Sequence, residues 1–347
     1  MIELLGLVLI SFLITSILLV PYIDFLYHLR KKNLKKLEIH HSEVNIEASK
    51  NRNIHTPITN KLLGYKDIDT PVGGGLLIIP VTIILTILTV LFTDIEMSNE
   101  IYLLIFTLIS FGLIGFVDDI RKIFALFYGK YHGIRGRYLL ILQLIFASLI
   151  ACALYFVVGI NNLYVPIFGN VVLGSFYIPL AVFIIVSFAN AYNISDGLDG
   201  LSSGLLMICL FAFLALASAS FNQYLSVFVG VWIGALIAFL YFNVYPARIY
   251  LGDAGAYGFG AALAVVGLLT GKVVGLAVIG GMYIIIVASS LIQILSKRFL
   301  HKKILPVTPI HMYFKFLGWE EPKIVFRFWL AGIIFAFFGL WLALLSS

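Results

Sequence analysis

Five of the seventeen acidic residues in this chain stand in three short, glycine-rich clusters. They are Asp118 and Asp119, then Asp196 and Asp199, then Asp253. Carboxylates held close together repel one another, and a divalent cation or a lysine relieves that repulsion. Magnesium prefers carboxylate and phosphate oxygens as ligands. If the fold brings the clusters together, they predict a site for magnesium and a phosphate-bearing ligand.

The first cluster lies in the segment Gly-Phe-Val-Asp-Asp-Ile-Arg-Lys, residues 115–122. On a continuing helix, Asp118 and Asp119 lie four and three residues before Lys122, so the three side chains can be neighbours. A group of charges that only marks a helix end at the membrane surface would look the same. Both interpretations remain open for this cluster alone.

Polar residues recur at every third position of the second cluster, at Asn190, Asn193, Asp196 and Asp199. On a helix, the first three of these share one face. The segment 190–201 contains no lysine or arginine, so we expect a metal or a cationic residue from another loop to neutralise it. The alternative is a well-capped turn at the membrane interface.

The third cluster contains one aspartate, Asp253, which follows Gly252. It is either the N-cap of a helix or an exposed metal ligand. Tyr250, three residues earlier, could stack on a planar base, although interfacial tyrosines often anchor a protein in the membrane.

Two other segments contain candidate polar groups. Lys66 precedes Thr70 and the run Gly73–Gly75, and glycines at a helix N-terminus suit a phosphate. The same glycines could instead allow close helix packing. His311 is the lone histidine of the segment 304–327, and its role could be structural or chemical.

The composition shows what kind of protein must position these groups. Of 347 residues, 61% are hydrophobic and 12% are charged, whereas soluble chains have about 25% charged residues. This excludes soluble enzymes, disordered chains and fibrous repeats, and it predicts a protein that crosses the membrane many times. Cys152 and Cys209 lie in apolar runs and imply no disulfide framework.

Ten apolar runs are long enough to cross a bilayer, which needs about 20 residues per helix. They predict an all-α integral membrane protein with a single polytopic domain, 1–347. The runs are not the short alternating segments of a β-barrel, and the first is expected to be a retained span and not a signal peptide. The predicted spans are 2–28, 73–93, 101–117, 137–158, 171–190, 201–219, 224–243, 256–271, 273–296 and 325–345.

The basic residues predict the orientation of these spans. Of 23 lysines and arginines, 22 lie on the odd-numbered loops 29–72, 118–136, 244–255 and 297–324 or at their edges. The positive-inside rule places those loops in the cytoplasm. Both termini are then on the outer face, and all three acidic clusters are on the cytoplasmic face.

Together, these motifs resemble the polyprenyl-phosphate N-acetylhexosamine-1-phosphate transferase superfamily, and the last resembles the branch that uses a muramoyl-pentapeptide donor. The resemblance covers nearly the whole chain in the family's order and rests on residues 66–75, 115–122, 190–201, 242–256 and 308–329. It implies transfer from UDP-N-acetylmuramoyl-pentapeptide to undecaprenyl phosphate, with release of UMP. It also implies a Mg2+ requirement, a bacterial plasma (inner) membrane location, the lipid bilayer as a partner, no nucleic acid, and a homodimer as one possible assembly.

The resemblance also implies roles for individual residues. Asp253 would bind magnesium, with Asp118 and Asp119 as further candidates at the lipid-phosphate end. Asp118 would be the general base or nucleophile, and His311 would join the catalytic group. Tyr250 stands where the family has a phenylalanine that stacks on uracil. The other substrate-binding candidates are Lys66, Thr70, Lys122, Asn190, Asn193, Asp196 and Asp199.

Three departures from the family pattern leave alternatives open. Only His311 remains of three consecutive histidines, because Met312 and Tyr313 follow it. Two hydroxyls usual after the magnesium aspartate are alanines here, and the interval after Lys66 is one residue longer. The alternatives are a transferase that uses UDP-N-acetylglucosamine or a related donor, a weakly active homologue, and a transporter that uses interfacial carboxylates.

Overall fold

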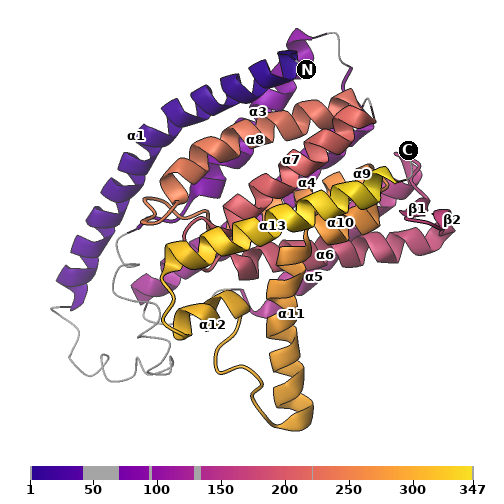
Figure 1. The fold of residues 1–347 in the computed structure, drawn as a ribbon. Helices are drawn as coiled ribbons and strands as arrows, with labels where there is room; N and C mark the ends of the chain where they lie inside the picture. Colours follow the sequence, from indigo (N-terminus) through magenta and orange to yellow (C-terminus); the bar gives the residue numbers. More distant parts are fainter. Residues whose placement is uncertain (1, 42–69, 94–95, 129–133, 221, 346–347) are drawn as a thin grey trace.

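A computed structural model describes residues 2–41, 70–93, 96–128, 134–220 and 222–345 (Figure 1). Ten helices in this part of the chain are long and apolar enough to cross a membrane. The predicted number of spans is therefore confirmed, and the protein is a helical membrane protein.

The long helices follow the predicted spans, with ends shifted by several residues. Helix α1 runs on to His41, because lysines and leucines of good helix propensity continue its apolar run, and α4 continues past Asp118 and Asp119 to Tyr128. The helices are α1 (Ile2–His41), α3 (Gly74–Phe92), α4 (Asn99–Tyr128), α5 (Gly136–Phe156), α6 (Tyr177–Ser195), α7 (Leu201–Ala219), α8 (Gln223–Asn243), α9 (Gly252–Leu269), α10 (Val273–Ile279), α11 (Gly281–Leu295), α12 (Ile310–Phe316) and α13 (Glu321–Leu344).

Helix α9 lies at the centre of the bundle, and every residue from Ala254 to Leu269 is buried. Glycines let its neighbours approach closely. A Cβ atom on Gly75 of α3 would lie 2.3 Å from the backbone nitrogen of Gly255, and one on Gly115 of α4 would lie 2.1 Å from the carbonyl oxygen of Asp253. These contacts fix the start of α9 against α3 and α4.

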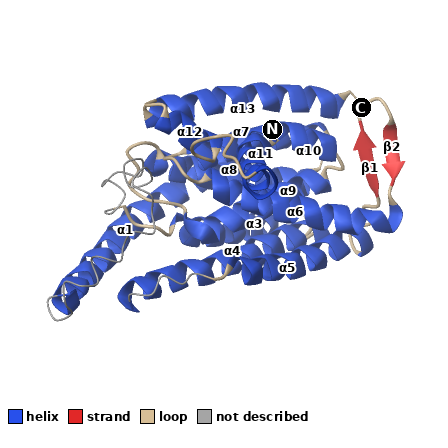
Figure 2. Ribbon diagram, turned by 90° about the horizontal axis from the view of Figure 1, so that it is seen from below, coloured by secondary structure: helices blue, strands red, loops and turns tan. Residues whose placement is uncertain are grey.

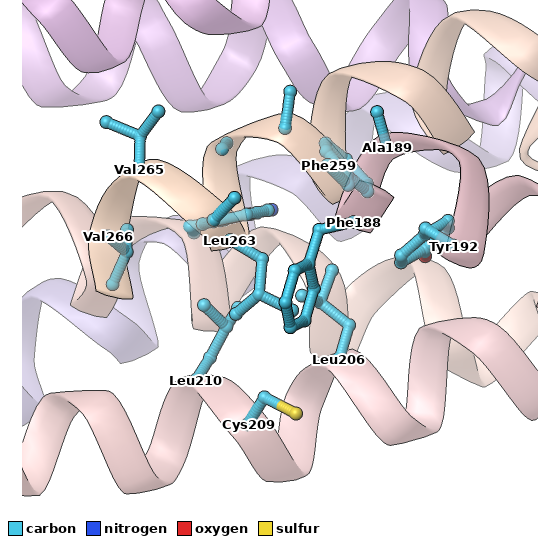
Figure 3. Close-up of a cluster of buried hydrophobic side chains, with 14 of the residues drawn as sticks. Phe188, Ala189, Tyr192, Leu206, Cys209, Leu210, Phe259, Leu263, Val265 and Val266 are labelled. Atoms are coloured by element: carbon cyan, nitrogen blue, oxygen red, sulfur yellow. The ribbon is translucent and has the colours of Figure 1, made fainter. Parts of the chain in front are cut away.

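The apolar core joins α6, α7 and α9 (Figure 3). The Phe188 side chain of α6 lies among Leu206 and Cys209 of α7 and Leu263 of α9. Both cysteines of the chain are free. This packed core supports the segments that contain the acidic clusters.

The predicted span 171–190 starts too early. Strands β1 (Asn162–Val165) and β2 (Gly169–Val172) form an antiparallel hairpin, and a 3-10 turn at Gly174–Phe176 precedes α6. Gly169 and Gly174 have φ angles of 78° and 55°, a backbone region that favours glycine and interrupts the helix. The hairpin is the only sheet in the described part of the chain.

The predicted span 273–296 is wrong as a single helix, because the chain breaks between α10 and α11. A Cβ atom on Gly280 would lie 2.5 Å from the Phe188 ring, and one on Gly281 would lie 2.8 Å from the Phe335 ring. Helix α11 then leaves the bundle at a steep angle, followed by a π-helical turn at Ser296–Leu300 (Figure 1).

The two ends of the bundle differ. The β hairpin and the C-terminus lie at one end, and α12 lies at the other (Figures 1 and 2). Asp118 and Asp119 lie inside α4, Asp196 and Asp199 follow α6, and Asp253 lies in the first turn of α9.

Candidate active site

The three acidic clusters meet at the N-terminus of α9. Both carboxylate oxygens of Asp119 accept backbone hydrogen bonds, from Asp253 and Ala254, each at 3.1 Å. The Nδ2 atom of Asn193 in α6 donates to Oδ1 of Asp253 at 2.9 Å. Helices α4, α6 and α9 therefore bring one residue of each cluster into direct contact.

Asp119 caps α9 from another helix. Its negative charge lies at the positive end of the α9 dipole, where it is favourable. Gly252 makes room for it, since a Cβ atom there would lie 2.9 Å from Oδ2 of Asp119. The interpretation of Asp253 as an N-cap is wrong, because it lies in the first turn and Leu251 precedes the helix.

Asp118 is buried and binds the backbone just before α5. Its Oδ1 accepts the backbone N–H of Ile134 at 2.7 Å. Lys122 lies one turn further along α4, but its side chain is outside the described residues, as is the whole of Lys66. The contacts predicted for these two lysines remain predictions.

Asp196 occupies the turn after α6, and the Ser202 hydroxyl donates to its carboxylate. Burial raises the pKa of Asp196 to about 6. The Ser202 hydrogen bond opposes this shift, and the charges of Asp253, Asp199 and Asp119 raise the pKa further. Negative charge thus accumulates here, and its expected neutralisation by a metal or by a cationic residue from another loop remains a prediction.

Asp199 and Glu321 link the turn to the C-terminal elements. Oδ2 of Asp199 accepts the N–H of Ala247 at 2.8 Å, and the N–H of Asp199 donates to Oε1 of Glu321 at 2.8 Å. The other oxygen of Glu321 binds Nζ of Lys315 in α12 at 2.9 Å. Glu321 was not among the predicted site residues; its place at the start of the last helix, close after His311 and Lys315, was the available signal.

His311 lies against the same turn from α12. It is 1% exposed, and a Cβ atom on Gly197 would lie 2.7 Å from its Nε2. Burial, with a smaller effect from the Lys315 charge, lowers the pKa of His311 to about 4. The imidazole is therefore neutral at physiological pH.

The glycines at the start of α3 support helix packing and not phosphate binding. The N–H groups of Gly73 and Gly74 donate to the carbonyl of Tyr250 at 3.0 and 2.9 Å, and that of Gly75 donates to Leu251 at 2.8 Å. The phosphate interpretation of this helix start is therefore wrong. These bonds attach the start of α3 to the Tyr250 segment.

Thr70 and Tyr250 lie in the two segments that these bonds join. The Thr70 hydroxyl donates to the carbonyl of Ala247 at 3.2 Å. The Tyr250 N–H donates to the carbonyl of Pro71 at 2.9 Å, and its side chain is half-buried. Their roles toward a substrate remain predictions.

The donor set at the α9 start fits a hard cation. Asp253 and the side-chain carbonyl group of Asn193 supply oxygens, which magnesium prefers. No group of three or more acidic, histidine or cysteine residues in metal-binding arrangement occurs among the described residues. Magnesium commonly takes only one or two carboxylates and completes its shell with water and substrate phosphates, so the residues present fit such a site.

Comparison with known proteins identifies relatives over most of the chain. Residues 101–271 match the glycosyl transferase family 4 model. The chain is 36% identical over 300 residues to the phospho-N-acetylmuramoyl-pentapeptide-transferase of Pelagibacter ubique, with coverage of 79% of this chain and 80% of the relative. It is 35% identical over 285 residues to the protein of the same name from Oceanobacillus iheyensis, with coverage of 80% and 85%.

These similarities extend through the helices that contain the acidic clusters. Their identity and coverage, together with the ten spans and the contacts between Asp119, Asn193 and Asp253, lead to one assignment. The chain belongs to the phospho-N-acetylmuramoyl-pentapeptide-transferase family.

Proposed function

We propose that the protein transfers phospho-N-acetylmuramoyl-pentapeptide from its UDP-linked donor to undecaprenyl phosphate. The products are UMP and the first lipid-linked precursor of peptidoglycan. The observation that carries this proposal is the meeting of Asp119, Asn193 and Asp253 at the start of α9, in a chain of this family. The orientation that fits is a cytoplasmic site in the bacterial plasma membrane, with both termini outside.

Asp253 would hold magnesium, and Asp118 is the next candidate. Asp119 already accepts two backbone bonds, which makes it better suited to orient Asp253 than to bind a metal. When bound, magnesium would neutralise the donor diphosphate and polarise it. The chain supports this by fixing α4, α6 and α9 around one position, because positioning and charge neutralisation dominate phosphoryl transfer.

The lipid phosphate would attack the donor directly. A phosphate monoester has a second pKa near 6 by analogy with phosphoserine, so it is largely ionised at neutral pH. A strong base is then unnecessary, so Asp118, buried and bonded to Ile134, would not need to remove a proton or form a covalent bond. Trapping a phosphoryl group on Asp118 after adding donor without lipid would contradict this step.

The remaining predicted contacts concern the nucleotide and diphosphate. Tyr250 would stack on uracil, and neutral His311 would stabilise the turn 196–200 beside the diphosphate. The other residues proposed to bind substrate are Lys66, Thr70, Lys122, Asn190, Asn193, Asp196 and Asp199.

A detergent assay of UMP release tests the proposed function. Purified protein, undecaprenyl phosphate and magnesium would be combined with UDP-N-acetylmuramoyl-pentapeptide or with UDP-N-acetylglucosamine. We expect release with the muramoyl-pentapeptide donor. Release only with UDP-N-acetylglucosamine would show that this nucleotide sugar is the donor. We consider this alternative first, because Met312 and Tyr313 replace two histidines that are usual in the family. No release with either donor would favour the inactive homologue or the transporter.

A further inference from the structure

The side chain of Asn190 has a fixed orientation in α6. Its Nδ2 donates to the backbone carbonyl of Val186 at 2.8 Å and to Oε1 of Gln143 at 2.7 Å. A backbone carbonyl can only accept, so the amide atom that faces Val186 must be the nitrogen. Both N–H bonds of Asn190 are therefore used within the protein, and its remaining polar atom, Oδ1, can only accept.

Gln143 is the residue in α5 that completes this arrangement. It is fully buried, and its Oε1 faces Asn190. Its Nε2 consequently has no hydrogen-bond acceptor in the part of the chain that the structure describes. An unsatisfied buried donor costs stability, and an apolar side chain of similar size would avoid that cost. The arrangement therefore serves the orientation of Asn190 and not the packing of α5.

Asn193, three residues later, is oriented in the same sense. Its Nδ2 donates to Oδ1 of Asp253. Because a carboxylate oxygen accepts hydrogen bonds, the amide atom that faces Asp253 must be the nitrogen. Residues three apart lie on one helix face, and both asparagines are half-buried. Neither Oδ1 atom has a donor among the described residues, so α6 offers two carbonyl oxygens beside the acidic cluster.

We propose that Gln143 is a positioning residue that makes Asn190 an obligate acceptor in the active site. The Oδ1 atom of Asn190 then either accepts a hydrogen bond from an N–H or O–H of the uridine part of the donor, or binds the magnesium ion. Either partner is called the electron-poor group. The Oδ1 atom does not bind a phosphate oxygen, which is itself an acceptor. This inference rests on the proposed function and assigns the chemistry of one of its subsites.

Substitutions at Gln143 separate orientation from packing. Q143M keeps the size of the side chain and removes the acceptor, whereas Q143E keeps an acceptor oxygen in either protonation state. We expect Q143M to weaken UMP binding about fivefold, a typical effect of one lost hydrogen bond, and Q143E to stay within twofold of the wild type. The matched control is S148A, which removes an exposed α5 hydroxyl bonded to the Leu144 carbonyl.

Calorimetry with UMP distinguishes the two sources of the electron-poor group. If the group belongs to uridine, Q143M weakens UMP binding equally without magnesium and at saturating magnesium. If it is the cation, Q143M raises the magnesium needed for half-maximal UMP binding about fivefold and leaves metal-free binding unchanged. In both cases the KM for undecaprenyl phosphate stays constant.

A double-mutant cycle tests whether Gln143 acts through Asn190. We expect N190A to weaken UMP binding at least as much as Q143M, and the double variant to equal N190A. Additive losses, or an N190A variant that binds UMP as the wild type does at every magnesium concentration, would overturn the inference. N190A tests it even if Q143M fails to fold. A wild type that binds UMP but releases none from either donor would instead count against the proposed function alone.

Discussion

Asp119 and Asp253 are in direct contact, yet their side chains have different tasks. Asp119 uses both oxygens to cap the N-terminus of α9. Asp253 accepts from Asn193 and lies where three helices converge. We infer that Asp119 acts on α9 and through it on Asp253, whereas Asp253 acts on the cation and the substrate.

Substituting each aspartate by alanine tests this division. D119A should destabilise the protein by about 1–2 kcal/mol, the usual cost of losing a cap and a favourable dipole interaction, and should also lower activity. D253A should abolish UMP release at all practical magnesium concentrations with a smaller change in thermal midpoint. D24N, at an exposed acid of α1, is the control.

Two outcomes would contradict the division. One is substantial rescue of D253A by raised magnesium, which would show that Asp253 is not the chief ligand. The other is a D119A variant with wild-type stability.

For individual residues, the sequence predicted which acidic clusters would come together. It did not predict which hydrogen bonds each carboxylate makes. The spacing of Asn190, Asn193 and Asp196 indicated a shared helix face. Nothing local to Asp119 reveals that its partners are amides 134 residues away. Such bonds depend on how α4 packs against α9, which the glycine contacts determine.

Among the elements, Glu321 at the start of α13 links three segments around the site. One oxygen accepts the Asp199 N–H and the other binds Lys315 of α12. Because His311 on α12 also packs against Gly197, the C-terminal elements fix the turn between α6 and α7 at two points.

Variants of Glu321 show which bond matters. E321A should lower kcat/KM about tenfold, because the turn loses a charge-assisted hydrogen bond of about 1.5–3 kcal/mol. E321Q should stay within about threefold, since its amide oxygen still accepts from Asp199. K315M should also have a small effect, because partly exposed ion pairs contribute little.

The neighbouring exposed residue Glu320, which makes no cap bond to α13, offers E320A as a control. An E321Q variant as impaired as E321A, together with an equally impaired K315M, would show that the ion pair and not the backbone bond holds the turn.

Hydropathy predicted the positions of the long helices well. It failed to predict the helix break at a pair of closely packed glycines. The break at Gly280–Gly281 lies inside a continuous apolar run, so composition cannot reveal it. The rings of Phe188 and Phe335, from distant segments, leave no room for a Cβ atom at either glycine. The β hairpin was missed because Val171 and Val172 extend the apolar run that becomes α6.

For the whole molecule, the basic residues and the acidic clusters imply one orientation. The β hairpin and the C-terminus lie at one end of the bundle, opposite α12 (Figure 1). If the basic loops are cytoplasmic, the hairpin is outside and α12 inside.

Cysteine labelling tests this orientation. In a background with Cys152 and Cys209 replaced by alanine, N170C in the hairpin should react with an impermeant maleimide in intact cells that have a permeable outer envelope. K303C, beyond α11, should react only after the inner membrane is opened. Both positions are exposed. The reverse pattern would invert the topology and place the site outside.

The proposed reaction joins a phosphosugar to a lipid phosphate at this site. Mass spectrometry of the lipids formed by the purified protein from undecaprenyl phosphate, magnesium and UDP-N-acetylmuramoyl-pentapeptide tests it most directly, with D253A as the negative control. We predict undecaprenyl-pyrophosphoryl-N-acetylmuramoyl-pentapeptide in amounts equal to the UMP released, and none with D253A. The absence of this lipid with the wild type, or equal amounts with D253A, would contradict the account.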